Sequence, residues 1–282
     1  FFFPDWGRMN EFFLNPGSAV AHSDRFDKSY CVHLWETDDL VDMSLITPEA
    51  MIEGSSTISN YVRPCLIDTT NQSVSLVFLT HNRLGDLEDC LSTYTVLGQT
   101  REDIVEILIY DNDSDAETKE YLGYLEQLPL IRVIYGKKNI GVAGGRAVLF
   151  SEAKGDIIFS LDSDSKSDGE GLIDEAKEIL ADPTIGMCGV AGCAIHNMST
   201  FEHTDYLKDG DIVGEVDSLA GCCQIFRRDV LDRMQMDLEY APFWLEDTDL
   251  CLQLRAAGLS VQRFASKGRF IHEWGSTGDK LF

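Results

Sequence analysis

The sequence holds 282 residues, of which 44% are hydrophobic, and carries a formal net charge of −25. The length allows one large or two small domains. The charge argues against a nucleic-acid partner, because binding to a phosphate backbone depends on lysine and arginine side chains. No apolar run approaches the roughly 18 residues of a membrane span, so we predict no membrane span in this chain.

The eight cysteines indicate a reducing compartment, because none forms a C-x-x-C pair and most stand within apolar stretches. Buried thiols of this kind behave as small hydrophobic side chains. No positively charged start followed by an apolar core marks a secretory signal. We expect a cytoplasmic protein, either free in the cytoplasm or peripheral to the inner face of the membrane.

Residues 1–71 show no regular alternation of strand and helix. We predict an irregular N-terminal extension here, followed by a second domain over residues 72–282. The sequence lacks an initiator methionine, which leads us to expect a piece of a longer protein. The Val-His-Leu-Trp phrase at residues 32–35 resembles the tail of the capsular-polysaccharide type of sugar transferase, and a packed aromatic cluster is the alternative.

From Ser73 the apolar pattern predicts strands that alternate with helices. The predicted strands cover residues 74–79, 104–110 and 131–135 and a run that ends at Asp162. The helices between them cover residues 84–97 and 116–127 and a segment that ends near Ala153. Strands and helices that alternate in steps of this length are typical of an α/β fold with a doubly wound, mostly parallel sheet flanked by helices.

Beyond Asp164 the alternation loosens. We predict a helix over residues 172–180 and a single strand over residues 187–195. A further helix is predicted over residues 245–258, because its first turn is acidic and a glycine ends it. Two last strands are predicted over residues 261–264 and 268–271.

Two carboxylates, Asp162 and Asp164, follow the buried strand directly. Ligands bind at the carboxyl ends of the strands in open α/β sheets. Two aspartates left close together there would repel each other unless a cation compensated them. A hard divalent ion with oxygen ligands is the simplest solution, although ordinary loop acids are the alternative.

A dinucleotide-binding enzyme is a competing interpretation, because Gly141, Gly144 and Gly145 open a helix and Asp162 follows about twenty residues later. The glycine pattern is not G-x-G-x-x-G, however, and it follows the third strand instead of the first. Asp164 also has no role in that scheme. The Walker pattern G-x-x-x-x-G-K-[ST] is absent, which excludes a P-loop nucleotidase.

Five motifs occur in a fixed order: Thr-His-Asn-Arg at residues 80–83, Asp-Asn-Asp-Ser at 111–114, Asn-Ile-Gly-Val-Ala-Gly-Gly-Arg at 139–146, Asp-Ser-Asp at 162–164 and Glu-Asp at 246–247. This set resembles the family 2 glycosyltransferases of GT-A fold over residues 73–277. The resemblance implies a GT-A type sheet and the transfer of a sugar from a nucleotide diphosphate.

The resemblance also implies roles for individual residues. The metal, Mn²⁺ or Mg²⁺, would be held by Asp162, Asp164 and His272. The acid Asp111 would accept a hydrogen bond from the base, which suits uracil or thymine, while Asp113 would either help or only cap a helix. The residues expected to contact the nucleotide are Thr80, Asn82, Arg83, Asp111, Asp113, Gly144, Gly145, Arg146, Asp162 and Ser163.

Inverting transfer requires a base near the acceptor hydroxyl, a role typically worth about 10²–10⁴ in rate. We predict Asp247 as this base and Glu246 as the second choice, with helix N-terminal stabilisation as the alternative role for both. The side chains of Trp244 and Trp274 are candidates for stacking on sugar faces, and core packing is equally compatible with the sequence.

The predicted activity is therefore that of an inverting, metal-dependent hexosyl- or deoxyhexosyl-transferase in glycan or polysaccharide synthesis. Its donor would be a UDP- or dTDP-sugar, and its acceptor a glycan, a lipid-linked glycan or a protein. The alternatives are a non-catalytic nucleotide-sugar-binding domain and a sugar-1-phosphate nucleotidyltransferase. The first would lack the base that Glu246 and Asp247 offer, and the second usually has a basic, glycine-rich loop that residues 80–83 do not provide.

Overall fold

The structure is a computed structural model that describes residues 69, 71–167, 171–208, 210–240, 244–267 and 269–272. Most of the predicted N-terminal extension and the candidate residue Trp274 lie outside the described residues. The division into domains at residues 71 and 72 therefore stays a prediction. The described residues 71–180 and 184–272 belong to one compact unit.

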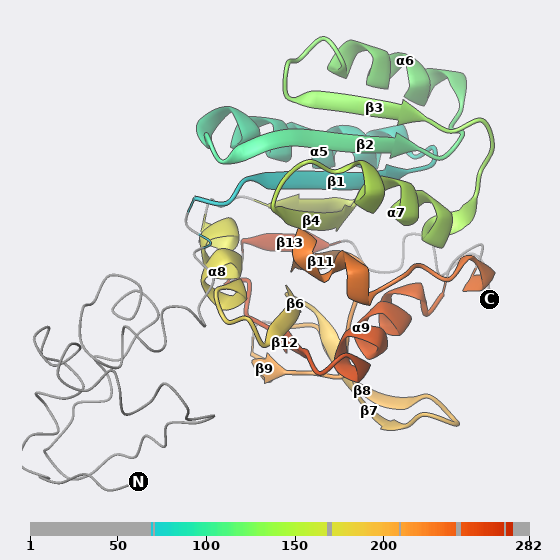
Figure 1. Ribbon diagram of the computed structural model, residues 1–282. Helices are drawn as coiled ribbons and strands as arrows, with labels where there is room; N and C mark the ends of the chain where they lie inside the picture. The colour runs from blue at the N-terminus through green and yellow to red at the C-terminus, as the bar shows by residue number, and fades with distance from the viewer. Residues whose placement is uncertain are drawn as a thin grey trace, which may run out of the picture. The chain divides into compact units, whose positions relative to one another are not determined.

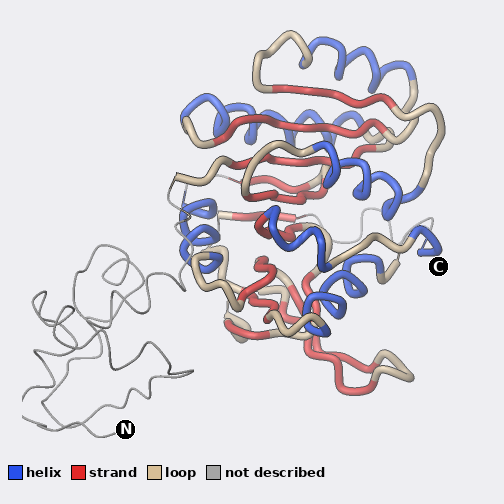
Figure 2. The backbone as a smooth tube through the Cα atoms, viewed as in Figure 1, coloured by secondary structure: helices blue, strands red, loops and turns tan. Residues whose placement is uncertain are grey.

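The first half of the unit alternates strands with helices, as Figures 1 and 2 show. In chain order its elements are β1 (Val74–Thr80), α5 (Leu84–Thr100), β2 (Ile104–Asp111), α6 (Ala116–Leu125), β3 (Ile131–Tyr135), α7 (Gly141–Glu152) and β4 (Ile157–Asp162). Each lies where the apolar pattern places it, with boundary differences of three residues or fewer.

The second half is less regular. It begins with β5 (Ser165–Ser167), α8 (Gly171–Leu180), β6 (Ile185–Gly189), β7 (Gly192–Asn197), β8 (Glu202–Tyr206), β9 (Gly214–Glu215) and β10 (Ser218–Leu219). It continues with β11 (Cys223–Arg227), the 3₁₀ helices η5 (Arg228–Arg233) and η6 (Leu238–Tyr240), α9 (Glu246–Ala256), β12 (Ser260–Arg263) and β13 (Phe270–His272).

The main sheet has eight strands in the order β3-β2-β1-β4-β11-β6-β12-β9. Strands β3, β2, β1 and β4 are parallel to one another, whereas β11 lies antiparallel between β4 and β6. The chain runs outward from β1 to β3 and then returns to place β4 on the other side of β1. This reversal is the topological switch point at which open α/β sheets bind ligands.

Alternating side chains of the strands feed two hydrophobic cores. On β1, Leu76 and Phe78 join helices α5 and α8 on one face, while Val77 joins α7 and α9 on the other. Figure 1 shows α5 and α7 on opposite faces of the sheet. A strand buried on both faces requires a continuous apolar run, which explains why β1 and β4 are recognisable in the sequence.

The prediction of one strand over residues 187–195 is wrong. The chain breaks after Gly189 and forms two strands that belong to different sheets, β6 in the main sheet and β7 in a sheet with β8 and β10. Position 189 itself has no room for a side chain, since a Cβ there would lie 2.3 Å from the carbonyl oxygen of Cys223. The apolar run is continuous because both strands are buried where they begin.

The six cysteines within the described ranges are all free and buried, which agrees with the expected packing role. In the part of the chain that the structure describes, no helix combines the length and the apolar character needed to cross a membrane.

Candidate nucleotide and metal site

Three strand ends meet at the switch point. In the strand register, Thr80 of β1 lies opposite Asp111 of β2, and Leu79 lies opposite Asp162 of β4. Residues from three predicted motifs therefore share one edge of the sheet. They come together because all three strands are parallel and end at the same level.

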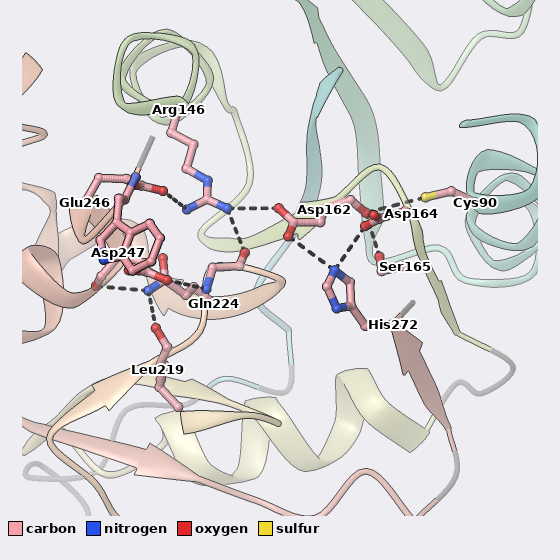
Figure 3. A network of polar contacts seen from close by, with 12 residues as sticks. Cys90, Arg146, Asp162, Asp164, Ser165, Leu219, Gln224, Glu246, Asp247 and His272 are labelled. Carbon is pink, nitrogen blue, oxygen red and sulfur yellow. Dashed lines mark hydrogen bonds and ion pairs between the residues drawn. The ribbon is translucent and has the colours of Figure 1, made fainter. Parts of the chain in front are cut away.

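The strand pair β5–β13 brings His272 to this edge. β5 follows Asp164 immediately, and its Ser165 pairs in register with His272. The imidazole Nε2 lies 3.0 Å from Oδ1 of Asp164 and 3.5 Å from Oδ2 of Asp162. Figure 3 shows the ring facing both carboxylates. The ligand atoms of the three side chains all lie within 4.8 Å of one another, so this group could hold a metal ion.

Neighbouring charges shift the pKa values of His272 and Asp162. Burial of the imidazole opposes protonation, but hydrogen bonds and charges of Asp162 and Asp164 outweigh it and raise the pKa of His272 to about 9. Burial also disfavours the ionised form of Asp162, yet the hydrogen bond from His272 and the charge of Arg146 hold its pKa below the usual value. In the absence of a metal ion, the raised pKa of His272 therefore favours a protonated imidazole whose positive charge faces the two carboxylates.

Arg83 lies at the same cluster. Its Nη1 is 3.2 Å from Oδ2 of Asp164, and its Nη2 pairs with Asp86. Asn82 and Arg83 both have φ of 59°, in the left-handed region that asparagine tolerates better than most residues. This turn directs the chain from β1 into α5 and presents Arg83 to the metal-site carboxylate.

The ends of β1 and β2 carry two buried side-chain oxygens that no described residue engages in a hydrogen bond. Among the described residues, Oδ2 of Asp111 and Oγ1 of Thr80 have no hydrogen-bond partner, whereas Oδ1 of Asp111 accepts from the backbone N–H of Ser114. Oγ of Ser114 in turn accepts from the backbone N–H of Asn82. A buried acceptor without a donor costs free energy, so the two oxygens mark a place where a ligand could donate.

Asp113 is not the helix cap. Its carboxylate pairs with Lys119 at 2.9 Å, and its side chain is 45% exposed. The N-cap of α6 is Asp115, whose Oδ1 accepts from the backbone N–H of Thr118. The capping alternative for Asp113 is therefore wrong, because the N-cap lies two residues later. The contact of Asp113 with a nucleotide stays a prediction.

The glycines of α7 allow the helix to pack closely. A Cβ on Gly145 would lie 2.3 Å from Cδ1 of Leu79, and one on Gly144 would lie 2.9 Å from Cγ1 of Ile140. Both glycines are buried. In this structure the small size of Gly145 serves the contact between α7 and β1, and that of Gly144 leaves room for the side chain of Ile140 at the N-cap of α7. A direct approach of either glycine to the nucleotide stays a prediction.

Arg146 follows these glycines and points across the site, as Figure 3 shows. Its Nη2 donates to Oδ1 of Asp162 at 3.0 Å and to the carbonyl oxygen of Gly221 at 2.9 Å. Its Nη1 lies 3.4 Å from Oε1 of Glu246. Arg146 is 4% exposed. The sequence predicts a nucleotide contact here; in the structure, the guanidinium bridges two carboxylates.

The two acids at the start of α9 differ in their surroundings. Glu246 is buried, and its two oxygens contact Arg146 and the backbone N–H of Trp244. Burial raises the pKa of Glu246, and the nearby charge of Arg146 opposes that effect. Asp247 is partly exposed, with Oδ2 accepting from the backbone N–H of Gly221 and Oδ1 from that of Thr248.

Trp244 stands immediately before α9 and is 53% exposed. Its φ of 112° and the φ of 67° at Leu245 are both unusual for residues with a side chain. The exposure excludes the core-packing alternative for Trp244. Ser163 lies in the turn between Asp162 and Asp164, between β4 and β5.

Two residues of this polar network, Gly221 and Gln224, were not among the site residues predicted from the sequence. Gly221 contacts both Arg146 and Asp247, and Gln224 donates from Nε2 to the carbonyl oxygens of Leu219 and Asp247. Gln224 is fully buried on β11. A glutamine inside an otherwise apolar run is the signal that could have revealed it, because buried polar side chains need partners.

The family model for "Glycosyl transferase family 2" matches residues 75–235, more than half of the 282 residues. The chain belongs to glycosyl transferase family 2. The match begins in β1 and extends beyond β11, so it includes Asp111, Arg146 and the Asp162–Asp164 pair.

Solved structures with a similar fold agree with this membership. The crystal structure of GalNAc-T7 with UDP, GalNAc and Mn²⁺ is 17% identical with a TM-score of 0.58, over 73% of this chain and 44% of that one. The mannosyltransferase PcManGT from Pyrobaculum calidifontis, in complex with GDP-Man and Mn²⁺, is 19% identical with a TM-score of 0.51, over 72% and 59%. The family 2 chain therefore has the GT-A fold that its motifs predict.

A curated relative is similar over much of the chain. The uncharacterized protein y4gI of Sinorhizobium fredii (strain NBRC 101917 / NGR234) is 22% identical over 231 residues, and the match covers 73% of this chain and 25% of the relative. The chain thus spans about a quarter of that relative, and less than two thirds of GalNAc-T7 and PcManGT.

Proposed function

We propose that this family 2 chain is an inverting, metal-dependent glycosyltransferase that moves a sugar from a UDP- or dTDP-sugar to an acceptor hydroxyl. The observation that carries the proposal is the convergence of Asp162, Asp164 and His272, whose ligand atoms lie within 4.8 Å of one another at the switch point.

The proposed metal ligands, two carboxylates and one imidazole, suit Mn²⁺ better than Mg²⁺. Carboxylates suit either ion, whereas an imidazole ligand favours the softer transition metal. The solved structures of GalNAc-T7 and PcManGT both contain Mn²⁺. When bound, the ion would supply Lewis-acid stabilisation of the diphosphate leaving group.

The nucleotide base is assigned to the ends of β1 and β2. The carboxyl group of Asp111 can accept the ring N–H of uracil or thymine through Oδ2, the oxygen that has no hydrogen-bond donor among the described residues. Thr80 offers a second buried oxygen directly across the strand pair. Guanine presents a different pattern of donors and acceptors, so we expect GDP-sugars to bind less tightly than UDP- or dTDP-sugars.

Asp247 is the proposed base. Two backbone N–H groups hold its carboxylate, and its partial exposure leaves it accessible to an acceptor. Glu246 is less suitable, because it is buried and both of its oxygens are engaged by Arg146 and Trp244. Asp247 would accept the proton of the acceptor hydroxyl as that oxygen attacks the sugar from the face opposite the diphosphate.

The acceptor side is assigned to Trp244. An indole that is 53% exposed beside the proposed base can stack on a sugar ring. We propose a glycan, lipid-linked or protein acceptor in glycan or polysaccharide synthesis, in the cytoplasm or at the inner face of the membrane. Trp274 remains a second stacking candidate on the sequence alone.

A panel of nucleotide sugars tests the proposal. UDP-glucose, UDP-N-acetylglucosamine, dTDP-rhamnose and GDP-mannose are incubated with Mn²⁺, with Mg²⁺ or with EDTA, and thermal stabilisation and donor hydrolysis are measured. We expect a UDP- or dTDP-sugar to raise the unfolding temperature with Mn²⁺ and not with EDTA. Equal stabilisation in EDTA, or stabilisation by the GDP-sugar alone, would contradict the proposal.

A further inference from the structure

We propose that Arg146 is a positioning residue that holds Asp162 in its metal-binding orientation against the start of α9. We propose further that position 221 is glycine because the guanidinium occupies the space of a side chain there. The inference rests on the proposed function, in which Asp162 is a ligand of the divalent ion. It assigns Arg146 a role other than the nucleotide contact that its motif implies.

The contacts of Arg146 leave little capacity for a diphosphate. Nη2 already donates to Asp162 and to the carbonyl oxygen of Gly221, while Nη1 faces Glu246. The residue is 4% exposed, and its charge is balanced by two carboxylates. A buried guanidinium of this kind fixes the groups around it, because every acceptor it holds would lose its partner if it moved.

The two carboxylate oxygens of Asp162 have different partners, which shows how Arg146 positions this side chain. Arg146 binds Oδ1 at 3.0 Å, and Oδ2 faces Nε2 of His272 at 3.5 Å. The planar guanidinium thereby fixes the rotation of the carboxylate and turns Oδ2 toward the metal cluster. Partners that orient metal ligands in this way typically change metal affinity by about 10–100-fold when they are removed.

Gly221 links this arrangement to the proposed base. A Cβ on Gly221 would lie 2.5 Å from both terminal nitrogens of Arg146, and the residue is buried. Its backbone N–H donates to Oδ2 of Asp247 at 2.9 Å, while its carbonyl oxygen accepts from Arg146. One peptide segment thus holds both the positioning arginine and the base. Figure 3 shows Arg146 beside Glu246 and Asp247 at the start of α9.

The test measures Mn²⁺ binding alone, with no nucleotide, from the electron paramagnetic resonance signal of the unbound ion. The first variant is Arg146→Lys, which keeps the positive charge and loses the planar guanidinium group with its two terminal nitrogens. The second is Gly221→Ala, which keeps every charge and displaces the guanidinium. Gly123→Ala is the matched control, since a Cβ at that helical glycine meets nothing within 4 Å. Unfolding curves confirm that each variant is folded.

We expect Arg146→Lys and Gly221→Ala each to weaken Mn²⁺ binding by about 10–100-fold, with Gly123→Ala unchanged. If Arg146 served the donor phosphates instead, its replacement would leave Mn²⁺ binding unchanged and would weaken only the later binding of UDP or dTDP. Unchanged or tighter Mn²⁺ binding by folded Arg146→Lys would overturn this inference alone. A wild-type chain that binds no Mn²⁺ would overturn the proposed function as well.

Discussion

Replacement of His272 by glutamine is expected to remove a specific pH dependence of stability in the metal-free protein. The imidazole faces Asp162 and Asp164 through Nε2, and its side chain is 11% exposed. These carboxylates favour the protonated ring and raise the pKa of His272 to about 9 from its usual 6.5. Glutamine keeps a polar side chain and cannot take up a proton.

The sign follows from the raised pKa of the folded state. A group that binds its proton more tightly when folded contributes its full stabilisation below the pKa of the unfolded chain, and loses it as the pH rises through the folded pKa. The window for His272 is therefore pH 6.5 to about 9. One pKa unit corresponds to about 1.4 kcal/mol, so the free energy of unfolding should fall by an amount on the order of 3 kcal/mol across this window.

The assay is urea unfolding in EDTA at several pH values between 6 and 9.5, with the variant subtracted from the wild type. His196→Gln, on the exposed part of β7, controls for the loss of a histidine elsewhere. We expect the difference in the free energy of unfolding between wild type and His272→Gln to shrink as the pH rises. In a separate measurement without EDTA, the Mn²⁺ affinity of the wild type should rise over the same range, because the ion competes with the proton. A difference that stays constant with pH would show that the folded protein does not bind the proton of His272 more tightly than the unfolded chain does.

Three further predictions concern single side chains. Asp247→Asn should keep UDP or dTDP binding by calorimetry and lose about 10²–10⁴ in transfer rate; retained turnover would place the base elsewhere. Asp164→Asn should weaken Mn²⁺ binding more than about tenfold in the resonance assay, and unchanged binding would remove Asp164 from the ligand set. Gly145→Ala should destabilise the fold by about 1–3 kcal/mol in urea unfolding, because its Cβ would overlap Leu79, whereas Gly123→Ala should not.

The first half of the fold could be predicted because its strands are buried on both faces. Mostly apolar runs such as Ile157–Asp162 stand out in a sequence, and parallel strands need long crossovers that separate them clearly. The antiparallel strand β11 was missed. Its segment begins with small residues and contains the buried Gln224, so its pattern does not resemble a core strand.

The sequence indicated which residues belong to the candidate site better than it indicated their roles. The order of the motifs identified Asp162 and Asp164, and the resemblance to family 2 glycosyltransferases supplied His272. Strand register then placed the three side chains together. The role of Arg146 was beyond the sequence, because it depends on Gly221, 75 residues away along the chain. Only the three-dimensional contact shows that this arginine is enclosed between two carboxylates and a backbone carbonyl.

The most direct measurement for the account is the anomalous diffraction of manganese in crystals grown or soaked with Mn²⁺ and UDP. We predict one strong peak, at a manganese ion that is coordinated by Asp162, Asp164 and His272 and that also contacts the diphosphate. Peaks only at other positions, with these three side chains turned away from the nucleotide, would contradict it.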